Sequence, residues 1–367
     1  MSKTFRFLRT LLLCLLASGA ALGQQATPQQ QSPLTSNEFL ALVRQLPKQP
    51  GVKAQIVEEL RRRGIGFELT PGLRSFVATK SGNDPDLRRA LEEAERRLRN
   101  PKEAEPPSLP EADELLKRTR EQTADAVASM PDFVVKQLIT RAHAQGTTRN
   151  WVTSDRLTVG VSYREQEGEK YRLLAVNGIV SPPGQAEERG NYNSAGGTNS
   201  TGEFVSILRL LFAPESKTDF KVVDAETLRG RRTYVYEFEV KRANSQHVLT
   251  FNDTRSVLVG SRGRLWVDRE LGRILRVESE ATEIPQDFPI TASSNAIDYE
   301  WVTIPQKGEY LLPSRSVLVM TVAAAGRVRQ SRNDTRFRNY QKYGSELKIL
   351  DDDEFVEEEA PPQPKKP

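Results

Sequence analysis

The stretch from Gly263 to Glu280 constrains the fold more than any other part of the chain, because apolar and polar residues alternate on both sides of a tight turn. If the loop is 269–271, with Gly272 in the left-handed conformation of a G1 bulge, the two strands form a hairpin. One face then carries Leu265, Val267, Leu275 and Val277. The other face carries Arg264, Trp266, Asp268, Arg276 and Glu278. The pattern therefore predicts an antiparallel sheet that packs on one side and faces water on the other.

The first 23 residues have the form of a secretory signal peptide. Basic residues precede an apolar run over 11–16, and small residues follow as far as Gly23. We expect cleavage before Gln24, which predicts a periplasmic or secreted protein. An uncleaved membrane anchor is the alternative, but the apolar run is short for a bilayer span of about 20 residues. No later stretch is long enough to cross a membrane, so we expect no span after signal removal.

Cys14 is the only cysteine and lies inside this apolar run, where the small residues that precede a lipid-attachment cysteine are missing. The mature chain then has neither a disulfide nor a thiolate site, and it must be stable through packing alone. The 53 basic and 49 acidic residues nearly cancel and are interspersed along the chain. We therefore expect no nucleic-acid partner.

The chain after the signal peptide begins with a helical part. Residues 24–33 are rich in Gln and have little to bury, which predicts a disordered leader. Residues 34–99 show four short amphipathic patterns, which predict a small helical bundle. Its expected helix-end signals are a capping box of Thr35 and Glu38, Gly64 after the second helix, and Thr70-Pro71 and Asp84-Pro85 before the third and fourth. The four prolines and the charges of 100–110 are typical of a semi-rigid linker.

The segment 111–343 is predicted to be a second domain, in which one helix that opens at Pro110 and ends near Ser129 precedes many strands. Two strands alternate most clearly; their apolar positions include Val159, Val161, Tyr163, Tyr234, Tyr236 and Phe238. A loop is expected at 181–202, and an acidic, Pro-rich tail at 344–367.

A helix is expected from Glu203 to Phe212. It carries apolar residues on almost every side, among them Phe204, Leu208 and Leu211. An apolar surface this wide predicts a helix that is buried nearly all round. The fold class is therefore α+β: a small N-terminal helical bundle followed by an antiparallel sheet with covering helices, for which a resemblance given below implies a half-barrel.

No motif for catalysis or metal binding appears. His143 and His247 lie far apart without ligand spacing around them, so we expect no metal and no cofactor. Asp268 and Glu278 could form the acid and base pair of a hydrolase. Cross-strand ion pairs with neighbouring arginines explain them better, and we expect no enzymatic activity.

Two resemblances to known families follow from these patterns. The run from Arg62 to Thr70 resembles a small helical module found in otherwise unrelated secreted bacterial proteins, which implies an adaptor that could bind a protein partner. Its three arginines at 61–63 are either a docking patch or a solvated helix end. The strand with Trp266-Val267-Asp268, the leading helix and the inserted helix resemble the half-barrel of the periplasmic lipoprotein carriers and sorting proteins.

The second resemblance implies a curved sheet whose apolar concave face, closed by helices, holds a lipid or acyl chain. The lining and lid would then be formed by Val159, Val161, Tyr163, Tyr234, Tyr236, Phe238, Leu265, Val267, Leu275, Val277, Phe204, Leu208 and Leu211. The arginine that holds the lid in those carriers has no assignable counterpart here. The alternative function is an envelope interaction or scaffold protein whose sheet is filled by its own side chains, and a hydrolase ranks third.

Overall fold

The computed structural model describes residues 32–180, 197–198, 204, 206–252 and 254–344. The expected signal peptide, the leader up to residue 31 and the tail beyond residue 344 lie outside these ranges. Most of the loop expected at 181–202 lies outside them too, as does Glu203. None of the helices in the described ranges combines the length and the apolar character that a membrane crossing requires.

The protein is α+β, as the sequence predicts, with helices that are mostly N-terminal and a large antiparallel sheet that is not closed. The α-helices are α1 Ser36–Val43, α2 Val52–Arg63, α3 Pro71–Ser81, α4 Pro85–Arg99, α5 Leu109–Ala128 and α6 Ser206–Phe212. Short 3-10 helices are η1 Pro101–Ala104, η3 Pro214–Ser216 and η4 Arg242–Asn244.

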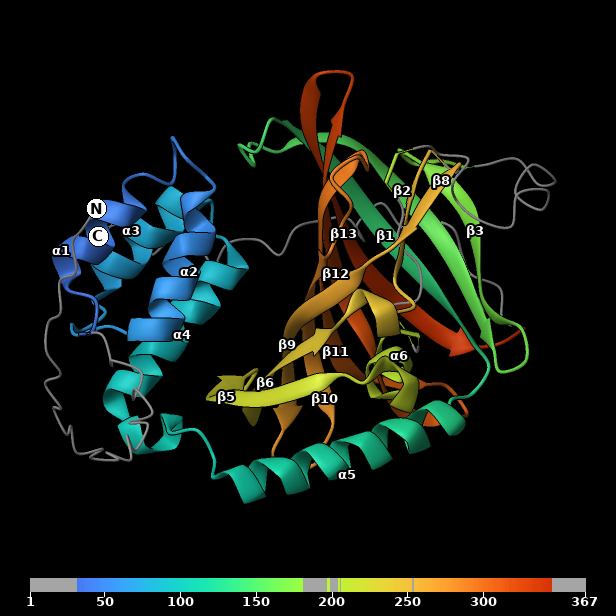
Figure 1. Ribbon diagram of the computed structural model, residues 1–367, viewed down its shortest axis with the longest axis horizontal. Helices are drawn as coiled ribbons and strands as arrows, with labels where there is room; N and C mark the ends of the chain where they lie inside the picture. Colours follow the sequence, from blue (N-terminus) through green and yellow to red (C-terminus); the bar gives the residue numbers. More distant parts are fainter. Residues whose placement is uncertain (1–31, 181–196, 199–203, 205, 253, 345–367) are drawn as a thin grey trace, which may run out of the picture. The chain divides into compact units, whose positions relative to one another are not determined.

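The strands are β1 Phe133–Gln145, β2 Val152–Arg164, β3 Gly168–Val176, β4 Ile179–Val180, β5 Asp219–Leu228, β6 Arg231–Val240, β7 Val248–Phe251, β8 Arg255–Leu258, β9 Gly260–Asp268, β10 Ile274–Thr282, β11 Ile290–Ile304, β12 Gly308–Ala324 and β13 Arg327–Lys342. Eleven of them form one sheet in the order β4-β3-β2-β1-β13-β12-β11-β10-β9-β6-β5, and β7 pairs with β8 separately. The last strand therefore lies inside the sheet, between β1 and β12 (Figure 1).

The helix-end signals of the N-terminal part are confirmed. Thr35 and Glu38 form both hydrogen bonds of a capping box, and Thr70 and Asp84 accept hydrogen bonds from the first turns of α3 and α4. Gly64 follows α2 with φ +66°, a conformation that favours glycine. Helices α1 to α4 enclose an apolar core of their own, which includes Phe39, Ile56, Leu60, Leu87 and Leu91.

One face of the sheet, called the inner face here, is covered by α5 and α6 (Figure 1). Helix α5 buries Ala112, Leu115, Thr119 and Thr123 against this face. Two apolar clusters lie on this face. The β1–β2 cluster includes Phe133, Val135, Ile139, Leu157, Val159, Val161, Phe337 and Tyr340, and the β6–β9 cluster includes Leu115, Tyr234, Tyr236, Phe238, Leu265, Val267, Val277, Ile297 and Tyr299.

The β9–β10 hairpin forms with the predicted turn, since Gly272 has φ +63°. One residue of the predicted register is wrong. Ile274 pairs with Val267 whereas Arg276 pairs with Trp266, so β10 has one extra residue at Leu275. Leu275 therefore packs with Trp266 on the opposite face of the sheet, called the outer face here, and Ile274 takes its place on the inner face.

The prediction that the outer face of this hairpin is wet is also wrong. Trp266 is 0% exposed, Asp268 1% and Arg276 6%. Arginine side chains of α2 and α4 lie over this face, with the guanidinium carbons of Arg61 and Arg89 at 5.5 and 5.2 Å from the centre of the Trp266 ring. The sequence pattern alone shows which residues share a face, but not whether another part of the chain covers it.

Gly263 leaves less room for a Cβ atom than any other glycine in the described ranges, and we predict that Gly263→Ala is strongly destabilising. A Cβ atom there would lie 1.9 Å from the carbonyl oxygen of Glu278 and 2.8 Å from the ring of Phe238. Because a backbone atom cannot move aside as a side chain can, we expect a loss of about 3 kcal/mol or more in the free energy of unfolding, measured with urea. The control is Gly72→Ala in α3, where nothing lies within 4 Å. Equal urea midpoints for the two variants would contradict the prediction.

Candidate functional site

The inner face gathers twelve of the thirteen residues predicted to line a ligand site. Val159, Val161, Tyr163 and Phe204 belong to the β1–β2 cluster. Tyr234, Tyr236, Phe238, Leu265, Val267, Val277 and Leu211 belong to the β6–β9 cluster, and Leu208 packs against it. Leu275 is the exception, because the bulge in β10 turns it to the outer face.

Phe204 lies at the centre of an aromatic group in the β1–β2 cluster. Its ring centre is 5.4 Å from that of Phe133, 5.3 Å from Phe337 and 6.4 Å from Tyr340. The Tyr340 hydroxyl donates to the carbonyl oxygen of Pro313 at 2.6 Å, so its polar end is satisfied within the sheet. Phe204 is thus a buried ring on the inner face, two residues before α6.

Two tyrosines fix α5 to the β6–β9 cluster. The Tyr236 hydroxyl donates to the carbonyl oxygen of Ala112 at 2.8 Å, and the Tyr234 hydroxyl donates to Glu111 at 2.5 Å. Burial, and then the hydrogen bond to Glu111, raises the pKa of Tyr234 to about 12. Both hydroxyls therefore stay protonated and hold the helix in place rather than acting as acids or bases at neutral pH.

Helix α6 differs from its prediction. Only Leu211 is buried, whereas Ile207, Leu208, Leu210 and Phe212 are half-buried and Arg209 is exposed. The helix is held at its C-terminal end, where the Thr218 hydroxyl donates to the carbonyl oxygen of Leu211 at 2.7 Å. An apolar helix that is only partly covered, yet lies on an apolar sheet face, has surface left to pack against something else.

Two clefts are lined mainly by charged side chains, although the first also reaches Leu115 and Tyr234 of the β6–β9 cluster. One, of about 450 Å³, lies beside the start of α5 and includes Glu111, Arg118 and Arg269. The other, of about 400 Å³, lies beside the start of α4 and includes Arg89, Arg276 and Asp298. Neither has the apolar lining that an acyl chain requires.

The carboxylates of the hairpin are engaged in ion pairs. Burial would raise the pKa of Glu278, but the positive charges of Arg276, Arg61 and Arg89 outweigh it and lower that pKa to about 2. Burial likewise opposes ionisation of Asp268, yet hydrogen bonds from Arg231 and from the N–H groups of residues 270 and 271 lower its pKa below the usual range. A hydrolytic acid would need a raised pKa, so this pair does not fit that role.

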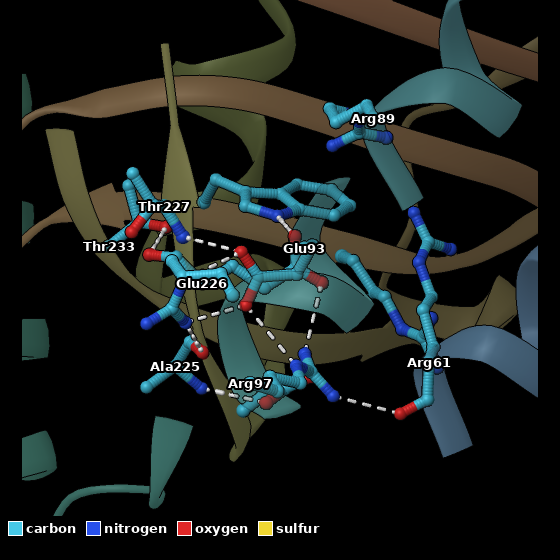
Figure 2. Close-up of polar contacts among 12 residues, drawn as sticks. Arg61, Arg89, Glu93, Arg97, Ala225, Glu226, Thr227 and Thr233 are labelled. Atoms are coloured by element: carbon cyan, nitrogen blue, oxygen red, sulfur yellow. Dashed lines mark hydrogen bonds and ion pairs between the residues drawn. The ribbon is translucent and has the colours of Figure 1, made fainter. Parts of the chain in front are cut away.

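Charged side chains hold helices α2 and α4 on the outer face of the sheet. Arg97 of α4 pairs with Asp224 and donates to the carbonyl oxygen of Arg61 at 2.9 Å, while Glu93 accepts from the N–H of Thr227 at 3.1 Å (Figure 2). The indole N–H of Trp266 donates to Glu226 at 2.7 Å. Of the three arginines at 61–63, Arg61 docks onto the chain's own sheet, whereas Arg62 and Arg63 pair with acids of the helical part.

The two histidines are not brought together. His143 contacts the hydroxyl of Ser154 at 2.9 Å, and burial lowers the pKa of His247. Within the described ranges no three His, Cys, Asp or Glu residues are grouped as metal ligands.

Comparison with known proteins gives similarity of structure only. No protein-family model and no curated protein matches the sequence. Similar solved structures include a putative outer membrane lipoprotein-sorting protein domain from Vibrio parahaemolyticus (14% identity, 63% of this chain and 93% of that one, TM-score 0.30). A DUF1329 family protein from Desulfovibrio piger also matches, with 10% identity over 66% of this chain and 97% of that one, and a TM-score of 0.27. The MucA/MucB complex of Pseudomonas aeruginosa matches with 12% identity over 62% of this chain and 94% of that one, and a TM-score of 0.17.

The family that the sequence resembles is thus found among the similar structures. Those proteins are 10 to 14% identical to this chain and align with low TM-scores, so the similarity concerns the fold and carries none of their properties over.

We predict that Glu278→Gln weakens the fold in a pH-dependent way. Because the pKa of Glu278 is lowered from 4.5 to about 2, its charge stabilises the folded state above about pH 4.5, and this contribution is lost as the pH falls towards 2. Removal of the charge is expected to cost up to about 3 kcal/mol in the free energy of unfolding at pH 7 and much less at pH 3.

The matched control is Glu280→Gln, two residues along the same strand. Among the described residues Glu280 pairs with Arg262 alone, and both side chains are largely exposed, so the expected cost is below about 1 kcal/mol at either pH. Equal losses of unfolding free energy for the two variants at pH 7 would show that Arg61, Arg89 and Arg276 do not need the charge of Glu278.

Proposed function

We propose that the protein is a non-enzymatic binding protein of the periplasm or the secreted space, and that it holds an apolar lipid or acyl ligand between the inner face and α6. The observation that carries this proposal is the half-covered α6. Ile207, Leu208 and Phe212 lie against the β6–β9 cluster but keep part of their apolar surface uncovered. An acyl chain placed beside them would remove that surface from water.

The arrangement of the inner face supports such a site. Both clusters lie on one face of a single sheet, and α5 is fixed across it by the tyrosine hydrogen bonds. The titratable groups of the hairpin lie on the outer face and are engaged in ion pairs, which favours binding over catalysis. The N-terminal pattern of a signal peptide supports an address outside the cytoplasm.

The alternative is a scaffold protein whose sheet is filled by its own side chains. The burial of Phe204 among Phe133, Phe337 and Tyr340 favours it, because these rings occupy one part of the inner face. The helical part would then be the region that binds a protein partner. Native mass spectrometry of the purified protein, with titration of a fluorescent fatty acid, separates the two proposals. Co-purified lipid and saturable probe binding support the carrier, and a ligand-free mass without probe binding overturns it.

We predict that Leu208→Ala weakens retention of the fluorescent fatty acid by about tenfold, because it removes apolar contact area from α6. Its cost in the free energy of unfolding should stay below about 1 kcal/mol, since the residue is only half-buried. Leu211→Ala should instead cost about 2 to 5 kcal/mol, since Leu211 is 5% exposed. Leu109→Ala, where the leucine is 70% exposed, is the control for both measurements. If Leu208→Ala retains the fluorescent fatty acid as well as the parent protein does, α6 does not line the binding site.

A further inference from the structure

Gln137 is a polar residue in the middle of an apolar surface. It shares the inner face of β1 with Phe133, Val135 and Ile139, because alternate residues of a strand point to the same side. Its direct neighbours on the adjacent strands are Val159 and Phe337, both members of the β1–β2 cluster.

The side chain of Gln137 is without a hydrogen bond. The residue is 1% exposed, and neither its Nε2 nor its Oε1 has a partner in the described part of the chain. A buried amide that loses its hydrogen bonds to water and gains none from the protein is costly to the fold. Packing therefore does not explain the choice of glutamine, since an apolar side chain of the same size would fit the cluster better.

Two further groups of this kind lie on the same face. Ser316 on β12 is 1% exposed and its hydroxyl has no partner among the described residues. It pairs with Ile297 of the β6–β9 cluster on one side and with Thr335 on the other. Asn295, two residues before Ile297 on β11, has a buried Oδ1 without a partner.

These residues form one line across the sheet, which we call the polar strip: Gln137 on β1, Thr335 on β13, Ser316 on β12 and Asn295 on β11. The register places them in order, because Thr335 pairs with Ile139 next to Gln137 on the inner face, and with Ser316 on the other side. The strip begins inside the β1–β2 cluster, at Gln137, and ends on β11 beside Ile297 of the β6–β9 cluster. Four of the seven buried polar side-chain atoms without a partner in the described ranges belong to it.

We infer that the polar strip recognises the carbonyl of an ester or amide linkage in an acyl lipid, with the acyl chains lying on the apolar clusters at either side. The Gln137 amide supplies the donor for such a carbonyl. The Ser316 hydroxyl, two strands away, and the acceptors Gln137 Oε1 and Asn295 Oδ1 can bind other polar groups of the same linkage region. The inference rests on the proposed function and adds to it the part of the ligand that is recognised. A plain hydrocarbon would leave the strip unsatisfied, so it should bind more weakly.

The test compares two phospholipids with identical chains and head group, one ester-linked and one ether-linked, as competitors of the fluorescent fatty acid on the purified protein. The ether lacks the carbonyl acceptor. We expect the ester to compete about tenfold better with the parent protein, the difference that one good hydrogen bond makes. In Gln137→Leu the two lipids should compete equally, while the melting temperature stays the same or rises.

The matched control is Gln330→Leu. Gln330 is also a buried sheet glutamine, but its Nε2 donates to the Thr321 hydroxyl at 3.3 Å and its Oε1 accepts from the N–H of Arg149 at 3.2 Å. This variant should melt at a lower temperature and keep the ester preference.

Failure of the polar-strip inference can be distinguished from failure of the proposed function. If the parent binds the probe but does not distinguish ester from ether, the polar-strip inference is overturned and the proposed function stands. A Gln137→Leu variant that melts lower, as Gln330→Leu should, would give Gln137 a structural role and also overturn it. A parent that binds no probe overturns both the inference and the function on which it rests.

Discussion

Every part of this structure depends on the need to cover both faces of one wide sheet. A strand that is buried on both faces needs something packed against each, and the β9–β10 hairpin carries apolar residues on one face and Trp266 among charges on the other. Helices α5 and α6 cover the inner face through apolar packing. Helices α2 and α4 cover the outer face through arginines that stack on Trp266 and pair with acids. The inner face is covered by apolar contacts and the outer face by cation–π contacts and ion pairs, because the two faces carry different side chains.

Local signals in the sequence predicted the elements well. The caps at Thr35, Thr70 and Asp84 and the turn at Gly272 act within a few residues, so their outcome depends little on the rest of the fold. The position of Leu275 was not predictable in the same way, because a bulge after the turn inserts this one residue on the outer face, while Arg276, Val277 and Glu278 keep the predicted faces. The fold class followed from the alternating pattern, which depends only on burial of one side of each strand.

Neither the covering of the outer face nor the polar strip could be predicted from the sequence, and both were found only in the structure. A tryptophan surrounded by charges was the available signal for the first, since a large ring in water is unfavourable unless something lies over it. Arg61 and Arg89, which provide that cover, are far from the hairpin in sequence. The glutamine at position 137 interrupts an apolar run, but its lack of a partner depends on the two neighbouring strands β2 and β13 and was beyond any single-sequence pattern. Half-burial of α6 likewise depends on what surrounds it.

The position of β13 has a consequence for how the chain reaches its folded state. Phe133 pairs with Lys342, so β1 gains its second neighbour only after about 200 further residues have been made. Contacts between distant residues form slowly, because a long loop must close before they contribute any stability. Until then, the inner sides of β1 and β2 are an apolar surface at an open strand edge, which is prone to aggregation. A protein built in this way needs protection of its first strands until its last strand arrives.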